Sequence, residues 1–312
     1  MPKTGVHRSP WRDFPDVVIQ TTVHKLRSRP AYDKAKGGVG EAAFEVVREL
    51  IKPEKIPFGF DTVVPVMQFD RDKPNALPLV YATALAKHFD AFLETGIHQI
   101  NVVSHAFADA QTRILGQPMF IGKIQAGSRI LIVDDVVTYG STLANLRGWL
   151  EEQGATVIGA TTLAAGFGGT KLALPDIVRD RLLDCFPRQA EALANELGFS
   201  AECFTNREAR FLAGLKNEHE MQRLIVAARE LTLLQERQAS LGRTNEIDPP
   251  MLAYTMSSSD KLKLPEVRFL TPEEDQQLTD LAEDIAQQML GPDWKERQEQ
   301  RRAALSAKNV PQ

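Results

Sequence analysis

Two adjacent carboxylates and a short run of hydroxyl-bearing residues are the part of the sequence best suited to chemistry. Asp134 and Asp135 follow the apolar segment Ile130 to Val133, and residues 138–142 then read Thr-Tyr-Gly-Ser-Thr. Carboxylates do not bind phosphate, but they accept hydrogen bonds from sugar hydroxyls or face a divalent cation. The segment therefore predicts a site with a carboxylate end and a hydroxyl-rich end.

The hydroxyl-rich end is predicted to lie where a helix begins, because apolar residues recur at helical spacing from residue 141 to 153. Backbone N–H groups in the loop would then point outward at the positive end of the helix dipole, and the hydroxyls would add donors. A glycine in the loop permits the positive φ that anion-binding turns often need. The loop predicts a phosphate cradle without a lysine, formed by Thr138, Tyr139, Gly140, Ser141 and Thr142.

Strands that alternate with helices predict the scaffold around this site. Short apolar segments at 62–66, 99–103, 129–133 and 155–163 read as strands, and residues 77–93 and 141–153 read as helices. This alternation is typical of parallel β-α-β units with right-handed crossovers. We therefore expect an α/β fold with a parallel, Rossmann-like sheet, whose ligand lies at the carboxyl ends of the strands.

The block from Ile130 to Thr142 resembles the phosphoribosyl-pyrophosphate (PRPP) motif of the type I phosphoribosyltransferases: four apolar residues, two acids, two apolar residues, then Thr-x-Gly-x-Thr. The resemblance implies that Asp134 and Asp135 contact the ribose hydroxyls and that residues 138–142 hold the 5-phosphate. By appearance, the nearest members are the competence-associated phosphoribosyltransferase-like proteins. Tyr139 departs from the family pattern, which commonly has a small Thr or Ala there.

The resemblance extends more weakly from Asp61 to Thr170. The loop after the first strand takes the place of the family's pyrophosphate loop, and residues 108–124 take the place of the mobile loop that covers the site in catalytic members. Basic residues in these two loops are the candidate contacts for pyrophosphate. They are Arg71, Lys73, Arg113 and Lys123.

The resemblance implies transfer of the ribosyl 5-phosphate group from PRPP to a nucleobase or related nitrogen acceptor, with release of pyrophosphate and with Mg²⁺ as cofactor. It also implies a homodimer. Purine-salvage members often have an Asp at the first loop position, where this chain has Thr138. An alternative stays open, in which a non-catalytic regulatory or interaction protein binds PRPP or a nucleotide on the same fold. A strand-to-helix turn without any ligand also stays open.

Composition limits the class of protein. Apolar residues make up 43% and charged residues 25% of the 312 residues, as is typical of a folded, water-soluble chain. With 37 basic and 41 acidic residues, the net charge of −4 gives no global attraction to nucleic acid or anionic membrane, although a local basic patch stays open. No apolar run is long enough for a membrane span, and Cys185 and Cys203 lack zinc-site spacing. We expect a cytoplasmic protein.

The flanking regions predict helical additions to the α/β core. Residues 1–54 read as an N-terminal region with an arm at about 1–15, mobile or packed, and a helix at 40–51. Residues 55–174 read as the phosphoribosyltransferase-like domain, and 175–240 as a helical region with segments near 176–197, 206–216 and 218–239. Thr205 with Glu208, and Thr271 with Glu274, predict helix-starting capping boxes. Residues 241–312 read as a linker, a terminal helix and a charged tail that frays from Lys295.

Overall fold

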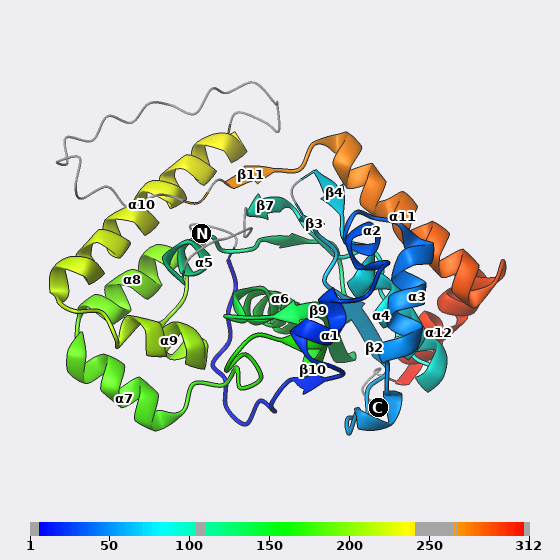
Figure 1. Ribbon diagram of the computed structural model, residues 1–312, viewed down its shortest axis with the longest axis horizontal. Helices are drawn as coiled ribbons and strands as arrows, with labels where there is room; N and C mark the ends of the chain where they lie inside the picture. Colours follow the sequence, from blue (N-terminus) through cyan, green and yellow to red (C-terminus); the bar gives the residue numbers. More distant parts are fainter. Residues whose placement is uncertain (1–5, 71, 104–109, 241–264, 266, 309–312) are drawn as a thin grey trace.

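The computed structural model describes residues 6–70, 72–103, 110–240, 265 and 267–308. At its centre lies a five-stranded parallel sheet in the order β1-β10-β9-β2-β5 (Figure 1). This confirms the predicted parallel α/β core. The five strands are β1 (Val18–Ile19), β2 (Thr62–Pro65), β5 (Phe92–Leu93), β9 (Arg129–Val137) and β10 (Thr156–Ala165).

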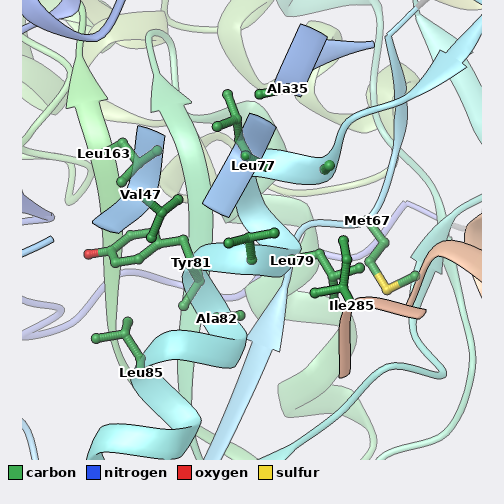
Figure 2. Close-up of a cluster of buried hydrophobic side chains, with 14 of the residues drawn as sticks. Ala35, Val47, Met67, Leu77, Leu79, Tyr81, Ala82, Leu85, Leu163 and Ile285 are labelled. Carbon is green, nitrogen blue, oxygen red and sulfur yellow. The ribbon is translucent and has the colours of Figure 1, made fainter. Parts of the chain in front are cut away.

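Helices cover both faces of the sheet, which explains why β9 reads as a continuous apolar run. Leu131 and Val133 pack into a core with α3 (Gly40–Leu50) and α4 (Ala76–Phe89). Figure 2 shows this core, in which Leu77 and Tyr81 of α4 lie near Val47 of α3. The intervening residues Ile130 and Ile132 pack instead against α6 (Ser141–Glu152).

A separate group of helices forms the unit on the left of Figure 1 and has its own apolar core. The expected helix at 176–197 is in fact two helices, because Phe186 and Pro187 interrupt it and Pro lacks the backbone N–H that a helix interior uses. The capping box of Thr205 with Glu208 is confirmed. The helices of this unit are α5 (Ala110–Leu115), α7 (Asp176–Cys185), α8 (Gln189–Leu197), α9 (Asn206–Leu212) and α10 (Glu218–Ser240).

The N-terminal segment is packed, which decides between the two alternatives left open by the sequence. Val6 and Trp11 are buried, and the indole N–H of Trp11 donates to the carbonyl of Phe204 at 2.7 Å. The chain then adds β1 to the sheet edge and continues through the short helices α1 (Val23–Arg27) and α2 (Tyr32–Lys36) to α3, with the 3₁₀ turn η1 (Pro53–Lys55) after it.

The expected strand at 99–103 does not join the central sheet. It forms two short strands, β6 (His98–Gln99) and β7 (Asn101–Val103). β6 pairs antiparallel with β8 (Phe120–Ile121), and β7 pairs antiparallel with β11 (Val267–Phe269). An apolar segment of this length fits either kind of pairing, and its partner in β11 is remote in sequence.

The C-terminal region packs on the core. α11 (Pro272–Leu290) begins with the predicted capping box of Thr271 and Glu274. The prediction that the chain frays from Lys295 is wrong, because α12 (Trp294–Lys308) docks beside β5, and buried Gln298 accepts a hydrogen bond from the N–H of Leu93 at 2.9 Å. The expected linker at 242–265 lies almost wholly outside the described residues. No helix in the described ranges is long and apolar enough to cross a membrane.

Candidate functional site

The acidic pair and the hydroxyl-rich loop lie on one strand-turn-helix unit at the carboxyl edge of the sheet. β9 continues through both acids to Val137, and α6 begins at Ser141. Gly140 caps the helix with φ +85°, and a Cβ there would lie 2.3 Å from Cδ2 of Leu172. A side chain at this position would therefore strain the backbone and would require the Leu172 side chain to shift.

The pKa values of the two carboxyl groups are shifted in opposite directions, although both groups are buried. Asp134 is 4% exposed and Asp135 is 3% exposed. Burial raises the pKa of Asp134, and the neighbouring charge of Asp135 raises it further. Burial also acts to raise the pKa of Asp135, but the ammonium group of Lys36 outweighs it and leaves that pKa below its ordinary value. Asp135 is thus the carboxylate that carries charge at neutral pH.

Lys36 belongs to the site, and the sequence motif did not reveal it. Its Nζ lies 3.1 Å from Oδ2 of Asp135 and 3.0 Å from Oδ2 of Asp70. Asp70 lies in the hairpin formed by β3 (Phe69–Asp70) and β4 (Lys73–Pro74), within the segment predicted as the pyrophosphate loop. Burial acts to lower the pKa of Lys36, but the two carboxylates raise it above its ordinary value. Lys36 precedes Asp135 by 99 positions, so no local spacing could signal the contact.

The loop at residues 138–142 offers backbone donors, because the first N–H groups of an α-helix have no acceptor within the helix. Two of its hydroxyl groups form hydrogen bonds with neighbouring side chains. Oγ1 of Thr138 accepts a hydrogen bond from Nη1 of Arg113 at 3.0 Å. Oγ of Ser141 donates to Oε1 of Glu208 at 2.6 Å. The Ser141 hydroxyl thus has a protein acceptor, and Arg113 places positive charge beside the loop.

Helix α9 contacts the same loop from the helical unit. Oγ1 of Thr205 donates to the carbonyl of Tyr139 at 2.7 Å, and the guanidinium of Arg207 lies 4.7 Å from the centre of the Tyr139 ring. The Tyr139 side chain packs against the core of the helical unit. This packing gives a physical reason for a large residue where the resembling family commonly has a small one.

A buried ion pair lies directly behind the loop. The side chains of Arg8 and Glu208 are both 0% exposed, and the Arg8 guanidinium meets the two carboxylate oxygens at 2.7 and 2.9 Å. Glu208 therefore joins the N-terminal segment, the loop and α9. The guanidinium donates three further hydrogen bonds, to Oδ1 of Asn145, Oε1 of Gln117 and the carbonyl of Cys203.

The predicted pyrophosphate contacts are dispersed. Lys73 is exposed on β4, Lys123 is exposed after β8, and Arg113 lies at the 138–142 loop rather than at the β3–β4 hairpin. Arg71 lies outside the described residues. Of the predicted covering loop at 108–124, residues 108 and 109 lie outside the described residues, and the rest contains α5 and β8, with Ile114 fully buried.

Asn75 is a second residue near the acidic pair that the motif did not reveal. It caps α4 by accepting the N–H of Leu77 at 3.2 Å, and its side chain contributes to the lowered pKa of Asp135. Its buried Nδ2 makes no hydrogen bond of good geometry to any described residue. A bound ligand with an acceptor oxygen would satisfy this donor.

Fold and site together define a parallel α/β protein with a buried acidic pair and a glycine-capped helix start at the carboxyl edge of its sheet. Residues 79–183 match the family model described as "Phosphoribosyl transferase domain". This match confirms the resemblance of the segment to the phosphoribosyltransferases.

Similar proteins include Protein TraN of Escherichia coli, which is 28% identical in an alignment of 263 residues that covers 81% of this chain and 59% of TraN. An uncharacterised protein of Haemophilus influenzae is 30% identical over 46% of this chain and 34% of its own length. The chain thus spans less than two thirds of either relative. HGPRTase-like protein 1 of Halalkalicoccus jeotgali is 28% identical over 43% of this chain and 78% of that protein. Among solved structures, adenine phosphoribosyltransferase from Saccharomyces cerevisiae covers 52% of this chain and 85% of its own, with a TM-score of 0.28 and 15% identity.

Proposed function

We propose that the protein binds PRPP at the β9–α6 turn and transfers the ribosyl 5-phosphate group to a nitrogen acceptor, with release of pyrophosphate. The observation that carries this proposal is the buried acidic pair followed by a helix-capping loop on a single strand-turn-helix unit. The helix N-terminus and the loop hydroxyl of Thr138 suit a phosphate monoester. The charged Asp135, three residues before Thr138 on β9, suits the ribose hydroxyls.

Catalysis would be electrostatic and positional. As the bond to pyrophosphate breaks, positive charge develops on the ribose ring, and the buried negative charge of Asp135 stabilises it. The 138–142 loop fixes the far end of the substrate, which limits the motion of the reacting carbon. Burial raises the pKa of Asp134, and in its protonated form this carboxyl group can donate a hydrogen bond to a ribose oxygen. The nitrogen acceptor is proposed to be a nucleobase, in line with the HGPRTase-like relative.

Magnesium fits this site as an ion carried by the substrate. No cluster of three or more His, Cys, Asp or Glu side chains suitable for a metal occurs in the described part of the chain. Mg²⁺ is commonly held by one or two carboxylates together with substrate phosphates, and Asp135 is such a carboxylate. When bound, Mg²⁺ would neutralise charge on the leaving pyrophosphate.

The contacts of α9 favour a second candidate function, in which ligand binding regulates an interaction. Thr205 holds the carbonyl of Tyr139, and Glu208 holds the hydroxyl of Ser141. A ligand that competes for either group would change how the loop contacts the helical unit. A PRPP-binding protein without transferase activity would use that change to alter a surface of α7–α10.

Pyrophosphate release distinguishes the two candidates. The protein would be incubated with PRPP, Mg²⁺ and each nucleobase in turn, with the Asp134→Asn/Asp135→Asn variant as control. Base-dependent release that is lost in the variant supports the transferase. PRPP binding without release for any base supports the regulatory candidate, and absence of binding refutes both.

A further inference from the structure

Lys36 reaches the site from outside the family motif and connects two parts of it. Its ammonium group lies between a carboxylate of β9 and a carboxylate of the β3–β4 hairpin, at 3.1 and 3.0 Å. The lysine side chain is 22% exposed, so a ligand arriving at the edge of the sheet could still reach it. The two carboxylates differ in environment, because the side chain of Asp135 is 5% exposed and that of Asp70 is 42% exposed.

The position of Lys36 is fixed by tight local packing. Ala35, its neighbour in α2, is fully buried. After α2 the chain turns through Gly37 and Gly38, and Gly38 has φ +87°. A Cβ on Gly38 would lie 3.1 Å from the carbonyl oxygen of Pro74, so the turn packs closely on β4. The ammonium group is therefore positioned before any ligand arrives, which lowers the entropic cost of using it.

The hairpin itself provides little positive charge for a pyrophosphate group. Asp70 and Asp72 are acidic, and the side chain of Lys73 is exposed on β4. If Asp135 holds the ribose hydroxyls, a cation 3.1 Å from its carboxylate lies beside the carbon that carries the pyrophosphate. Since the half-exposed Asp70 can be hydrated at small cost, whereas the buried Asp135 cannot, an incoming phosphate would replace Asp70 as a partner of the ammonium group.

We propose that Lys36 binds the pyrophosphate group of PRPP, with the ammonium group keeping its contact with Asp135 and exchanging Asp70 for a phosphate oxygen. This inference rests on the proposed function and names the cation that recognises the leaving group. Lys36 thereby links recognition of the pyrophosphate to the charge state of the carboxylate that holds the ribose.

Calorimetric titrations with PRPP and with ribose 5-phosphate, which lacks the pyrophosphate, test the proposal. Lys36→Met should weaken PRPP binding by about 10- to 100-fold, the loss expected for a hydrogen bond between charged groups. Ribose 5-phosphate binding should change by less than about 3-fold. Lys34→Met is the matched control, because Lys34 is an exposed lysine on the same helix, and it should change neither affinity.

Removal of Lys36 leaves Asp135 buried without its cation, and this change destabilises the fold by itself. The comparison is therefore repeated as Lys36→Met in an Asp135→Asn background, against Asp135→Asn by itself. The selective loss of PRPP affinity should persist. Equal losses for both ligands, or no loss for either, would overturn the role of Lys36 while leaving the proposed function standing. Absence of PRPP binding by the wild type would refute the proposed function and the inference with it.

Discussion

Removal of Arg8 should destabilise the whole protein, although the sequence alone gave this N-terminal residue no role. The side chains of Arg8 and Glu208 have no exposed surface, and they form a two-pronged ion pair at 2.7 and 2.9 Å. Arg8→Met leaves the Glu208 carboxylate buried without its cation. Breaking a buried pair in this way costs about 3 to 5 kcal/mol of unfolding free energy.

The expected change in melting temperature follows from the length of the chain. For a 312-residue protein that unfolds as one cooperative unit, a loss of that size lowers Tm by about 5 to 8 °C. Differential scanning calorimetry measures it directly. Arg181→Met is the control, because Arg181 is an exposed arginine of α7, and its Tm should stay within about 1 °C of the wild type.

A double-mutant cycle separates the ion pair from simple loss of packing. Glu208→Gln keeps the shape of the side chain and leaves Arg8 as the unpaired charge, while Arg8→Met/Glu208→Gln removes both charges. The double variant should therefore lose less unfolding free energy than the two single variants lose together, by about 1 to 3 kcal/mol. Additive losses of unfolding free energy would refute the assignment of a buried, mutually dependent pair. An Arg8→Met variant with the same Tm as the wild type would refute it as well.

Three further outcomes are expected. Because burial raises the pKa of Asp134, the contribution of this carboxyl group to folding stability falls as the pH rises through that pKa. In Mg²⁺-free buffer, Asp134→Asn should therefore have a higher Tm than the wild type at pH 8 but not at pH 4. Gly140→Ala should cost about 1 to 3 kcal/mol in urea unfolding, since φ is +85° and Leu172 fills the space. Tyr139→Ala should lower stability by a similar amount through lost packing with Arg207, yet keep ribose 5-phosphate affinity within about 3-fold by calorimetry, because the backbone serves the loop.

The centre of the site could be predicted from the sequence because its signals are local. The apolar run of β9 requires burial on both faces, the helix pattern begins at Ser141, and Gly140 supplies the positive φ between them. Those three features lie within a few residues of one another. The parallel sheet and both capping boxes were predictable for the same reason.

The remaining parts depend on contacts between residues that are distant in sequence. Lys36 and Asp135 are 99 positions apart, and Arg8 and Glu208 are 200 apart. No periodicity or spacing links such residues, so their roles emerge only from the fold. The strand at 99–103 was misplaced for a related reason, because its antiparallel partner β11 at 267–269 lies beyond the helical unit.

The central claim, that the β9–α6 turn binds PRPP, is tested most directly by a thermal-shift titration with PRPP and Mg²⁺ on the wild type and on Gly140→Ala. At about 100 times its dissociation constant, a ligand stabilises the folded state by about 2.7 kcal/mol, which corresponds to about 4 °C for a chain of 312 residues. We predict this shift for the wild type and its loss in Gly140→Ala. A well-folded wild type without a shift, or an equal shift in the variant, would contradict binding at this turn.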